Sequence, residues 1–179
     1  NPPVDNIREA LVFSLETRLG HQRNLLDETP EHARQLVADS PVLRDAETAA
    51  IREMDGDLRA ETVDVTYDPG RTTLRAAVEN VRAATAAAID DGADVVVLSH
   101  RDAGPDRVPI PSLLATGAVH HHLVRNGLRN HAGLVVESGD PRTTHHLATL
   151  VGYGADAVNP YLAYQTIADI VAGPDGADP

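Results

Sequence analysis

Hydrophobic residues follow a helical period in the first third of the chain. In the stretch NIREALVFSLE, Ile7, Leu11 and Leu15 recur at every fourth residue, which places them on one face of a helix. Asp5 stands where a side-chain oxygen caps the first turn of such a helix. We therefore expect a helical lead-in segment over residues 1–60.

Two further helix starts lie within this lead-in segment. Thr29 followed by Pro30 is typical of a helix start, here for EHARQLV, because proline lacks the N–H that the first turn leaves unpaired. Asp45 is placed to open a third helix.

The period changes at TVDVTYD, where Val63, Val65 and Tyr67 alternate with polar residues and predict a strand with one exposed face. A helical spacing returns from Thr72 to Ile89, and Gly92 stands where a glycine ends a helix. The rest of the chain repeats this order of strand and helix. The expected elements are the strand DVVVLS, a helix from about Ser112 to Asn126 closed by Gly127, the strand AGLVVES, a helix begun by Asp140 and Pro141, the strand DAVN and a helix from Tyr161.

This alternation predicts an α/β fold. Strands that are apolar throughout and separated by helices are typical of a parallel sheet with flanking helices and right-handed crossovers. About four strands are too few to close an eight-stranded barrel, so we expect an open sheet or a partial (β/α)-barrel. Residues 61–179 form this βα-repeat portion, and residues 1–60 precede it within a single structural domain.

Composition narrows the class of protein. The 179 residues are 42% hydrophobic, which suits one globular domain. The sequence has no apolar run of membrane-spanning length and no signal-like start, so we expect a cytoplasmic protein without a membrane partner. The net charge of -12 repels phosphate backbones, which argues against nucleic-acid binding. The acidic, lysine-free composition fits either a salt-loving source or a high-GC genome.

The chain contains no cysteine, which excludes from it a cysteine nucleophile, disulfides and iron–sulfur ligands. It contains nine histidines, three of them consecutive at His120, His121 and His122. Consecutive helical residues point about 100° apart, so these three cannot reach one ion, and His145 and His146 have the same limitation. We expect no metal site. One histidine of each group should pack against the sheet with its ring hydrogen-bonded, while its neighbours face water or another domain.

The candidates for chemistry follow the strands, because ligands of parallel sheets bind at the carboxyl ends of the strands. Glu137 ends an apolar strand, and a buried acid needs partners. We expect it to cap backbone amides or to pair with Arg101 or Arg142. Ser138 and His100 could act as a nucleophile and its general base, but the flanking VVESGD lacks the G-x-S-x-G turn that presents such a serine. The candidate polar cluster at the strand ends comprises Ser99, His100, Arg101, Glu137, Ser138 and Asn159.

Several stretches in fixed order carry a family resemblance. They are NPPVDNIREALV, RNLLDETPEHARQL, SPVL, DVTYD, RVPIPSLLATGAVHHHLVRNGLR, GLVVESGDPR and HHLATLVGYGADAVNPYLAYQTIAD. Together they resemble the central domain of the large chain of glutamate synthase, from about Asn1 to Asp169 and most closely from Arg107 to Thr166.

The resemblance implies an enzyme that moves the amide nitrogen of glutamine onto 2-oxoglutarate and reduces the product, giving two glutamates. In the family a cysteine hydrolyses glutamine, ammonia passes through an internal tunnel, and a domain with FMN and a 3Fe-4S cluster performs the reduction. Electrons come from a flavoprotein small subunit or from ferredoxin. The central domain joins the two catalytic domains, and its fold resembles part of the FMN-binding barrel. None of the family's catalytic residues falls on this chain.

Two hypotheses follow. The first is a structural connecting module that couples neighbouring glutaminase and FMN domains of the same chain, with no catalytic, cofactor-binding or metal residues of its own and no activity alone. The second is a self-sufficient barrel-type, metal-dependent hydrolase that uses Glu137 and histidines. The first also predicts exposed apolar surface, and hence self-association of the isolated chain.

Overall fold

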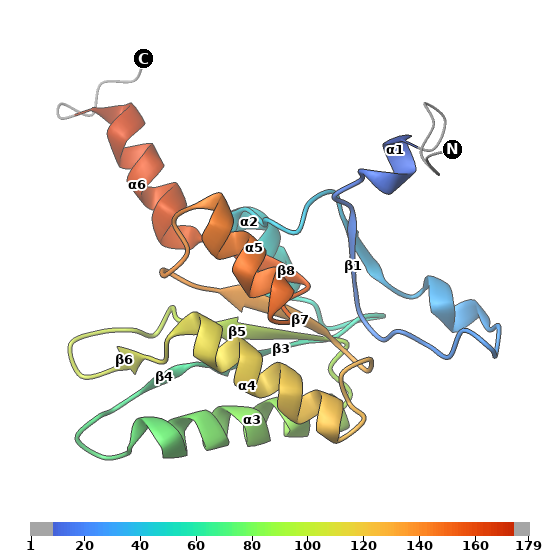
Figure 1. Cartoon of the computed structure of the whole chain (residues 1–179), viewed down its shortest axis with the longest axis horizontal. Helices are drawn as coiled ribbons and strands as arrows, with labels where there is room; N and C mark the ends of the chain where they lie inside the picture. The colour runs from blue at the N-terminus through green and yellow to red at the C-terminus, as the bar shows by residue number, and fades with distance from the viewer. Residues whose placement is uncertain (1–8, 174–179) are drawn as a thin grey trace.

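A four-stranded parallel sheet forms the centre of the computed structural model, which describes residues 9–173 (Figure 1). The strands lie in sequence order, and the register pairs Val95 with both Ala60 and Gly133. They are β3 (Ala60–Asp64), β5 (Val95–Ser99), β7 (Gly133–Glu137) and β8 (Ala157–Asn159). The prediction of a parallel sheet of about four strands is confirmed, and the sheet does not close into a barrel within the described residues.

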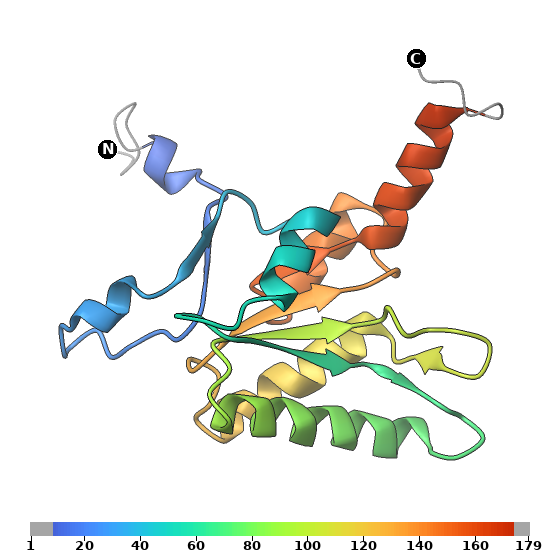
Figure 2. The same cartoon turned by 180° about the vertical axis from the view of Figure 1, so that it is seen from behind.

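The sequential strand order fixes where the helices lie. Each connection moves one strand further in the same direction, so right-handed crossovers place their helices on one face of the sheet. These helices are α3 (Leu74–Asp90), α4 (Ser112–Arg125) and α5 (Thr144–Gly152). Figure 1 and the view from behind in Figure 2 show α3 and α4 together against this face.

The two faces of the sheet are packed by different parts of the chain. Val96 and Leu98 of β5 belong to a buried cluster with side chains of α3 and α4. Val95 and Val97, which alternate with them, belong to a second cluster with Leu19, Leu43 and Ile51 from the N-terminal segment. Because both faces are covered, β5 and β7 are buried at every position, which explains their uninterrupted apolar sequences.

The N-terminal segment is less helical than its sequence predicts. Its elements are α1 (Glu9–Val12), β1 (Thr17–Leu19), the 3-10 helix η1 (Pro30–Ala33), β2 (Leu36–Ala38) and α2 (Asp45–Arg52). Asp45 opens α2 as expected. The helix expected through Leu15 ends at Val12, and Leu15 is exposed, while Asp5 and Ile7 lie outside the described residues.

The helix expected after Thr29 is a single 3-10 turn that leads into a strand. Leu36–Ala38 pairs antiparallel with Thr17–Leu19 instead of continuing the helix. This hairpin places Leu19 against Gly133, where a Cβ atom on the glycine would lie 3.1 Å from the Leu19 Cβ. Pairing with a distant strand therefore outweighs the local helix signal, which is a weak prior in a segment this short.

The outer edge of β8 is not free. Leu43 N donates to Val158 O at 2.9 Å, and Val158 N donates to Pro41 O at 2.7 Å. The segment between β2 and α2 thus continues the backbone ladder beyond the last strand of the sheet. At the far side, β4 (Thr66–Tyr67) and β6 (Val108–Pro109) form a short antiparallel pair beyond the carboxyl end of β3.

Helix ends follow the sequence signals closely, with one correction. Gly92 and Gly127 have φ values of 92° and 71°, the left-handed conformation expected of a glycine after a helix. Helix α5, however, is capped by Thr143 rather than begun by Asp140. The Asp140 carboxylate instead accepts from Ser112 N at 2.8 Å, at the start of α4. Asp140 therefore does cap a helix, but the helix is α4 and not α5.

The last element is α6 (Tyr161–Ala172), which extends away from the sheet in both views (Figures 1 and 2). No residue of α6 is buried. Among the described residues, no helix has the length and apolarity that crossing a membrane requires.

Candidate functional site

The parallel register brings the predicted strand-end residues to one edge of the sheet. Ser99 lies opposite Glu137 in the pairing of β5 with β7, and Glu137 lies opposite Asn159 in the pairing of β7 with β8. His100 N donates to Glu137 O, and Ser138 N donates to Asn159 O, so the next residues also remain side by side. Residues separated by up to 60 positions thus form one polar cluster at the carboxyl edge.

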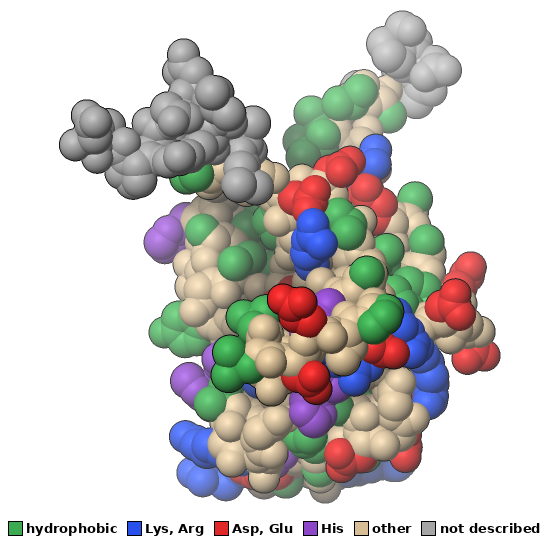
Figure 3. All heavy atoms as spheres, turned by 90° about the vertical axis from the view of Figure 1, so that its right-hand side faces the viewer, with side chains coloured by type: hydrophobic (Ala, Val, Ile, Leu, Met, Phe, Trp, Pro, Cys, Tyr) green, Lys and Arg blue, Asp and Glu red, His purple; other side chains and the backbone are tan. Residues whose placement is uncertain are grey.

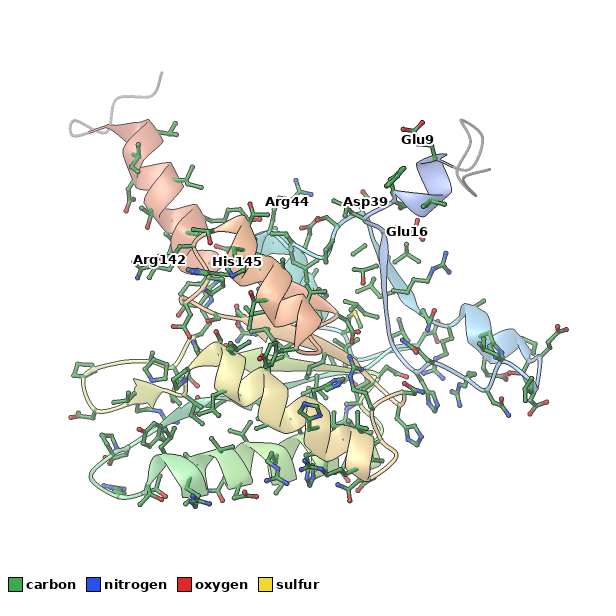
Figure 4. The ribbon with its side chains drawn as sticks, in the orientation of Figure 1. Glu9, Glu16, Asp39, Arg44, Arg142 and His145 are labelled. Atoms are coloured by element: carbon green, nitrogen blue, oxygen red, sulfur yellow. The ribbon has the colours of Figure 1, made fainter. Side chains whose placement is uncertain are left out.

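Glu137 is the buried centre of this cluster, with 2% of its side chain exposed. Its carboxylate accepts a hydrogen bond from Ser99 Oγ at 2.6 Å and another from Arg101 Nε at 2.8 Å. An Arg52 guanidinium nitrogen lies 3.5 Å from each carboxylate oxygen. The expected pairing with Arg101 is confirmed. Arg142, the other candidate, is exposed near the start of α5 (Figure 4).

Arg101 extends the cluster to α2 and α6. Its guanidinium carbon lies 4.1 Å above the centre of the Tyr161 ring, and one terminal nitrogen lies 3.3 Å from Asp45 Oδ1. The same Asp45 oxygen accepts from Asn159 Nδ2 at 2.9 Å. We call these residues the Glu137 cluster: Asp45, Arg52, Ser99, Arg101, Glu137, Asn159 and Tyr161.

Burial affects the chemistry of Tyr161 and Asn159. Burial raises the pKa of the Tyr161 phenol, an effect that the Arg101 charge opposes, so the phenol stays protonated and uncharged at neutral pH. Asn159 is fully buried, and its Nδ2 also donates to Leu43 O at 2.9 Å. Its Oδ1 has no partner among the described protein atoms. The side-chain amide of Asn159 therefore connects β8 to the N-terminal segment only through the hydrogen bonds that its nitrogen donates.

Ser138 and His100 meet, as a nucleophile and a base would. Ser138 Oγ lies 3.1 Å from His100 Nδ1, and His100 Nε2 lies 2.8 Å from Ile110 O. Because a carbonyl only accepts, Nε2 carries the proton and Nδ1 accepts from the serine hydroxyl. Burial lowers the pKa of His100, which favours this neutral ring.

Accessibility decides against catalysis by this pair. His100 is 2% exposed and Ser138 is 0% exposed, so a substrate does not reach the hydroxyl in this conformation. Ser138 Oγ also accepts from Asp140 N at 3.0 Å, while Ile110 precedes α4. The pair therefore joins the loops that follow β5 and β7, which is a structural task.

The histidine groups lie differently from the prediction. His145 and His146 are both exposed, and Figure 4 shows His145 on the outside at the start of α5. The prediction that one of them packs against the sheet is wrong, because Leu147 and Leu150 supply the apolar face of α5. In the triplet, the sheet-facing positions of α4 belong to Val119 and Leu123.

His120 instead contacts the turn before β8. Its Nδ1 accepts from Arg129 Nε at 3.1 Å, and the same arginine binds both carboxylate oxygens of Asp156 at 2.9 Å. No group of three or more histidine, aspartate or glutamate side chains within residues 9–173 is arranged to hold a metal ion. The His120 ring is hydrogen-bonded as predicted, but it lies against the turn before β8 rather than against the sheet, and contact of the triplet with another domain stays a prediction.

The fit of the implied cofactors can be judged from the residues present. A 3Fe-4S cluster needs thiolate ligands, and the chain has no cysteine. A flavin phosphate needs cationic or N–H donors, but Arg52 and Arg101 at the carboxyl edge already face Glu137. Neither group fits the Glu137 cluster, and we derive no chemistry through them here.

One hollow in the surface lies on the far side of β3 from the cluster. A groove of about 700 Å³ runs between β3 and α3 and is lined by Asp64, Tyr67 and Asn80 among others. The face seen in Figure 3 mixes hydrophobic, acidic, arginine and histidine side chains. The net charge of -12 disfavours binding to a phosphate backbone.

Sequence reasoning missed three members of the Glu137 cluster. The sequence marks Asp45 and Tyr161 only as helix starts, and it gives no signal for Arg52. Arg52 and Glu137 are 85 positions apart, so no local spacing connects them. The sequence Asn159-Pro160-Tyr161 places Tyr161 only two residues after the strand-end Asn159, and this short spacing was a signal that Tyr161 lies near the cluster.

Comparison with known proteins identifies the family. Residues 1–176 match the model of the glutamate synthase central domain. The chain is 46% identical over 171 residues to the glutamate synthase [NADPH] large chain of Azospirillum brasilense, covering 94% of this chain and 11% of that protein. It is 42% identical over 176 residues to the glutamate synthase [NADH] of Schizosaccharomyces pombe, covering 96% of this chain and 8% of that protein.

The same likeness extends to a third type of relative. The ferredoxin-dependent glutamate synthase of Pyropia yezoensis is 41% identical over 169 residues, covering 93% of this chain and 11% of that protein. The chain thus spans about a tenth of the length of these curated relatives. The matched family model covers nearly the whole chain, and the predicted resemblance is confirmed: the chain belongs to the glutamate synthase central domain family.

Proposed function

We propose that this chain is the connecting domain of a glutamate synthase and that it couples the glutaminase and FMN domains of the same polypeptide without performing chemistry itself. The enzyme would transfer the amide nitrogen of glutamine to 2-oxoglutarate and reduce the product to glutamate. We also propose that it works in the cytoplasm. The relatives include NADPH-, NADH- and ferredoxin-named enzymes, so the choice between a flavoprotein subunit and ferredoxin as electron donor stays open.

The observation that carries this proposal is the state of the Glu137 cluster. The carboxylates at the site where an α/β protein normally reacts are paired with neighbouring side chains. The Glu137 carboxylate accepts from Ser99 and Arg101, and the Asp45 carboxylate accepts from Arg101 and Asn159, which leaves the neutral Asn159 Oδ1 without a partner among the described protein atoms. A general base or metal ligand needs a free lone pair directed at the substrate. The metal-dependent hydrolase hypothesis is therefore not retained.

A mechanical role also explains what the cluster connects. It bonds α2 of the N-terminal segment to three strand ends and to the start of α6. Buried networks whose charged groups are paired are rigid and fix one arrangement of the elements they join. A domain that holds two reaction chambers in register needs this rigidity between its N-terminal and C-terminal parts.

The coupling role is tested in the full-length polypeptide. We would compare Glu137→Gln with Glu61→Gln, whose carboxylate is half exposed and pairs with Arg59 at 3.4 Å. The readouts are glutamine hydrolysed and glutamate formed by reduction of 2-oxoglutarate. We expect Glu137→Gln to raise the ratio of the first to the second at least threefold and Glu61→Gln to leave it unchanged.

The proposal that the isolated domain has no catalytic activity is tested separately. Glutaminase assays, flavin titration and elemental analysis should give no turnover, no stoichiometric flavin and no stoichiometric zinc. Turnover by the isolated chain, or an unchanged coupling ratio in Glu137→Gln, would contradict the proposal.

A further inference from the structure

Helix α6 carries an apolar stripe that the rest of the described chain does not cover. Ile167, Ile170 and Val171 follow the i, i+3, i+4 spacing of one helix face, and their exposed fractions are 57%, 73% and 64%. The stripe continues toward the base of the helix at Ala163 and Tyr164, which are half-buried. We call these five residues the α6 stripe.

The opposite face of α6 is polar. It presents Gln165 and Asp169, both exposed, and Asp169 is the only charged residue among the 12 of the helix. The helix is therefore amphipathic, and the described residues cover its apolar face only partly, at Ala163 and Tyr164 near its base. An isolated helix of about 12 residues is marginal in water, so most helical stability comes from packing the apolar face. The sequence of α6 is suited to a helix that is covered along its stripe.

We propose that the α6 stripe docks into an apolar groove on another domain of the same glutamate synthase polypeptide. This inference rests on the proposed function, because it names the surface through which the domain holds its neighbour. The mode is that of an amphipathic helix in a groove, with Ile167, Ile170 and Val171 as anchors. The lack of basic residues in α6 makes the contact apolar rather than charge-directed.

Two observations favour the same polypeptide over a second copy of this domain. The matched part is 11% of the relatives' length, so in such a protein most of the polypeptide lies outside this domain and is tethered to it. Tethered domains meet at an effective concentration on the order of millimolar. In addition, two copies each carry a net charge of -12 and repel one another.

Hydrogen exchange in the full-length polypeptide tests this docking. We expect the α6 amides to exchange at least tenfold more slowly there than in the isolated chain. Ile170→Glu should remove that protection, because it places a charge in the groove, whereas Gln165→Glu, a charge on the polar face, should keep it. In the isolated chain both variants should melt within about 1 °C of the wild type, since neither side chain is buried.

The outcomes are decisive in either direction. Equal exchange of α6 in the full-length and isolated proteins overturns the proposal, and so does equal loss of protection in both variants. Protection that grows with protein concentration means that a second copy covers the stripe, and it also overturns the proposal. The exchange readout is independent of the coupling ratio, so α6 docking can hold even where the coupling role of the domain fails.

Discussion

Arg101 Nε donates a 2.8 Å hydrogen bond to Glu137 Oε1, across 36 positions of sequence and between the ends of two neighbouring strands. The carboxylate is 2% exposed and the guanidinium side chain is 30% exposed, so one charge is buried and the other reaches solvent. The desolvation of Glu137 is offset only while Arg101 and Ser99 keep their hydrogen bonds to it. This pair is therefore the most sensitive point of the carboxyl edge.

Removing the charge of Glu137 should destabilise the fold. Breaking a buried ion pair costs roughly 3–5 kcal/mol, and the partial exposure of Arg101 puts Glu137→Gln near the lower end, at about 3 kcal/mol. The half-exposed Arg59–Glu61 pair should contribute less than about 1 kcal/mol. Urea unfolding of both variants of the isolated chain measures the difference. Similar losses in Glu137→Gln and Glu61→Gln would contradict this assignment.

Gly154 should not tolerate alanine. Its φ is +113°, and an added Cβ would lie 2.2 Å from the position of His120 Nδ1. Backbone strain and overpacking each cost about 1–3 kcal/mol, so we expect Gly154→Ala to lower the free energy of unfolding by about 2–5 kcal/mol. Gly56→Ala is the matched control, since nothing lies within 4 Å of its added Cβ.

A double variant separates the two causes at Gly154. Combining Gly154→Ala with His120→Ala removes the collision but keeps the left-handed backbone. Gly154→Ala should therefore lower the free energy of unfolding by less in the His120→Ala background than in the wild type. Full additivity of the two substitutions would mean that the contact with the ring is not what excludes a side chain.

The interaction of Asp140 with the start of α4 should behave as a helix cap. Its Oδ2 accepts from Ser112 N at 2.8 Å, and loss of a capping carboxylate costs about 1 kcal/mol. We expect Asp140→Ala to lower the free energy of unfolding by about that amount and Asp140→Asn to retain most of it. Thermal unfolding checks both. A loss in Asp140→Asn equal to that in Asp140→Ala would show that charge, rather than the hydrogen bond, carries the effect.

Stability should fall as the pH drops below about 6.5, and His100 should contribute to the fall. Burial lowers the pKa of His100 in the folded state from its ordinary 6.5. The unfolded chain therefore takes up the proton first, and folding loses free energy from about pH 6.5 downward. Burial lowers the pKa values of His21 and His120 in the same direction.

Substituting the histidine isolates its share of this pH dependence. His100→Gln should give a shallower decline of unfolding free energy between pH 7 and pH 5 than the wild type, although it starts from a lower stability. Between pH 7.5 and 8.5, where the ring is neutral in both states, the two curves should run parallel. Equally steep curves below pH 6.5 would exclude His100 as a source of the acid sensitivity.

The repeating strands and helices of this protein could be predicted from local sequence patterns. The uninterrupted apolar strands DVVVLS and GLVVES, the helical spacing between them and the glycines at positions 92 and 127 are local signals, and each agrees with the fold. Because the carboxyl ends of parallel strands meet at one edge of a sheet, the sequence also predicts that Ser99, Glu137 and Asn159 lie at the same edge. The quoted stretches also sufficed to identify the family.

Only the tertiary structure decided the N-terminal segment and the character of the site. The hairpin of β1 and β2 forms because Leu19 and Leu36 pack against one face of the sheet. The stability gained from this contact does not depend on the local spacing of apolar residues. Whether Glu137 is a reactive acid or a buried structural residue depends on Asp45 and Arg52 of α2 and on Arg101 after β5, which lie far from it in sequence. Pairing across such distances is set by packing, and packing is a property of the whole chain rather than of any stretch of it.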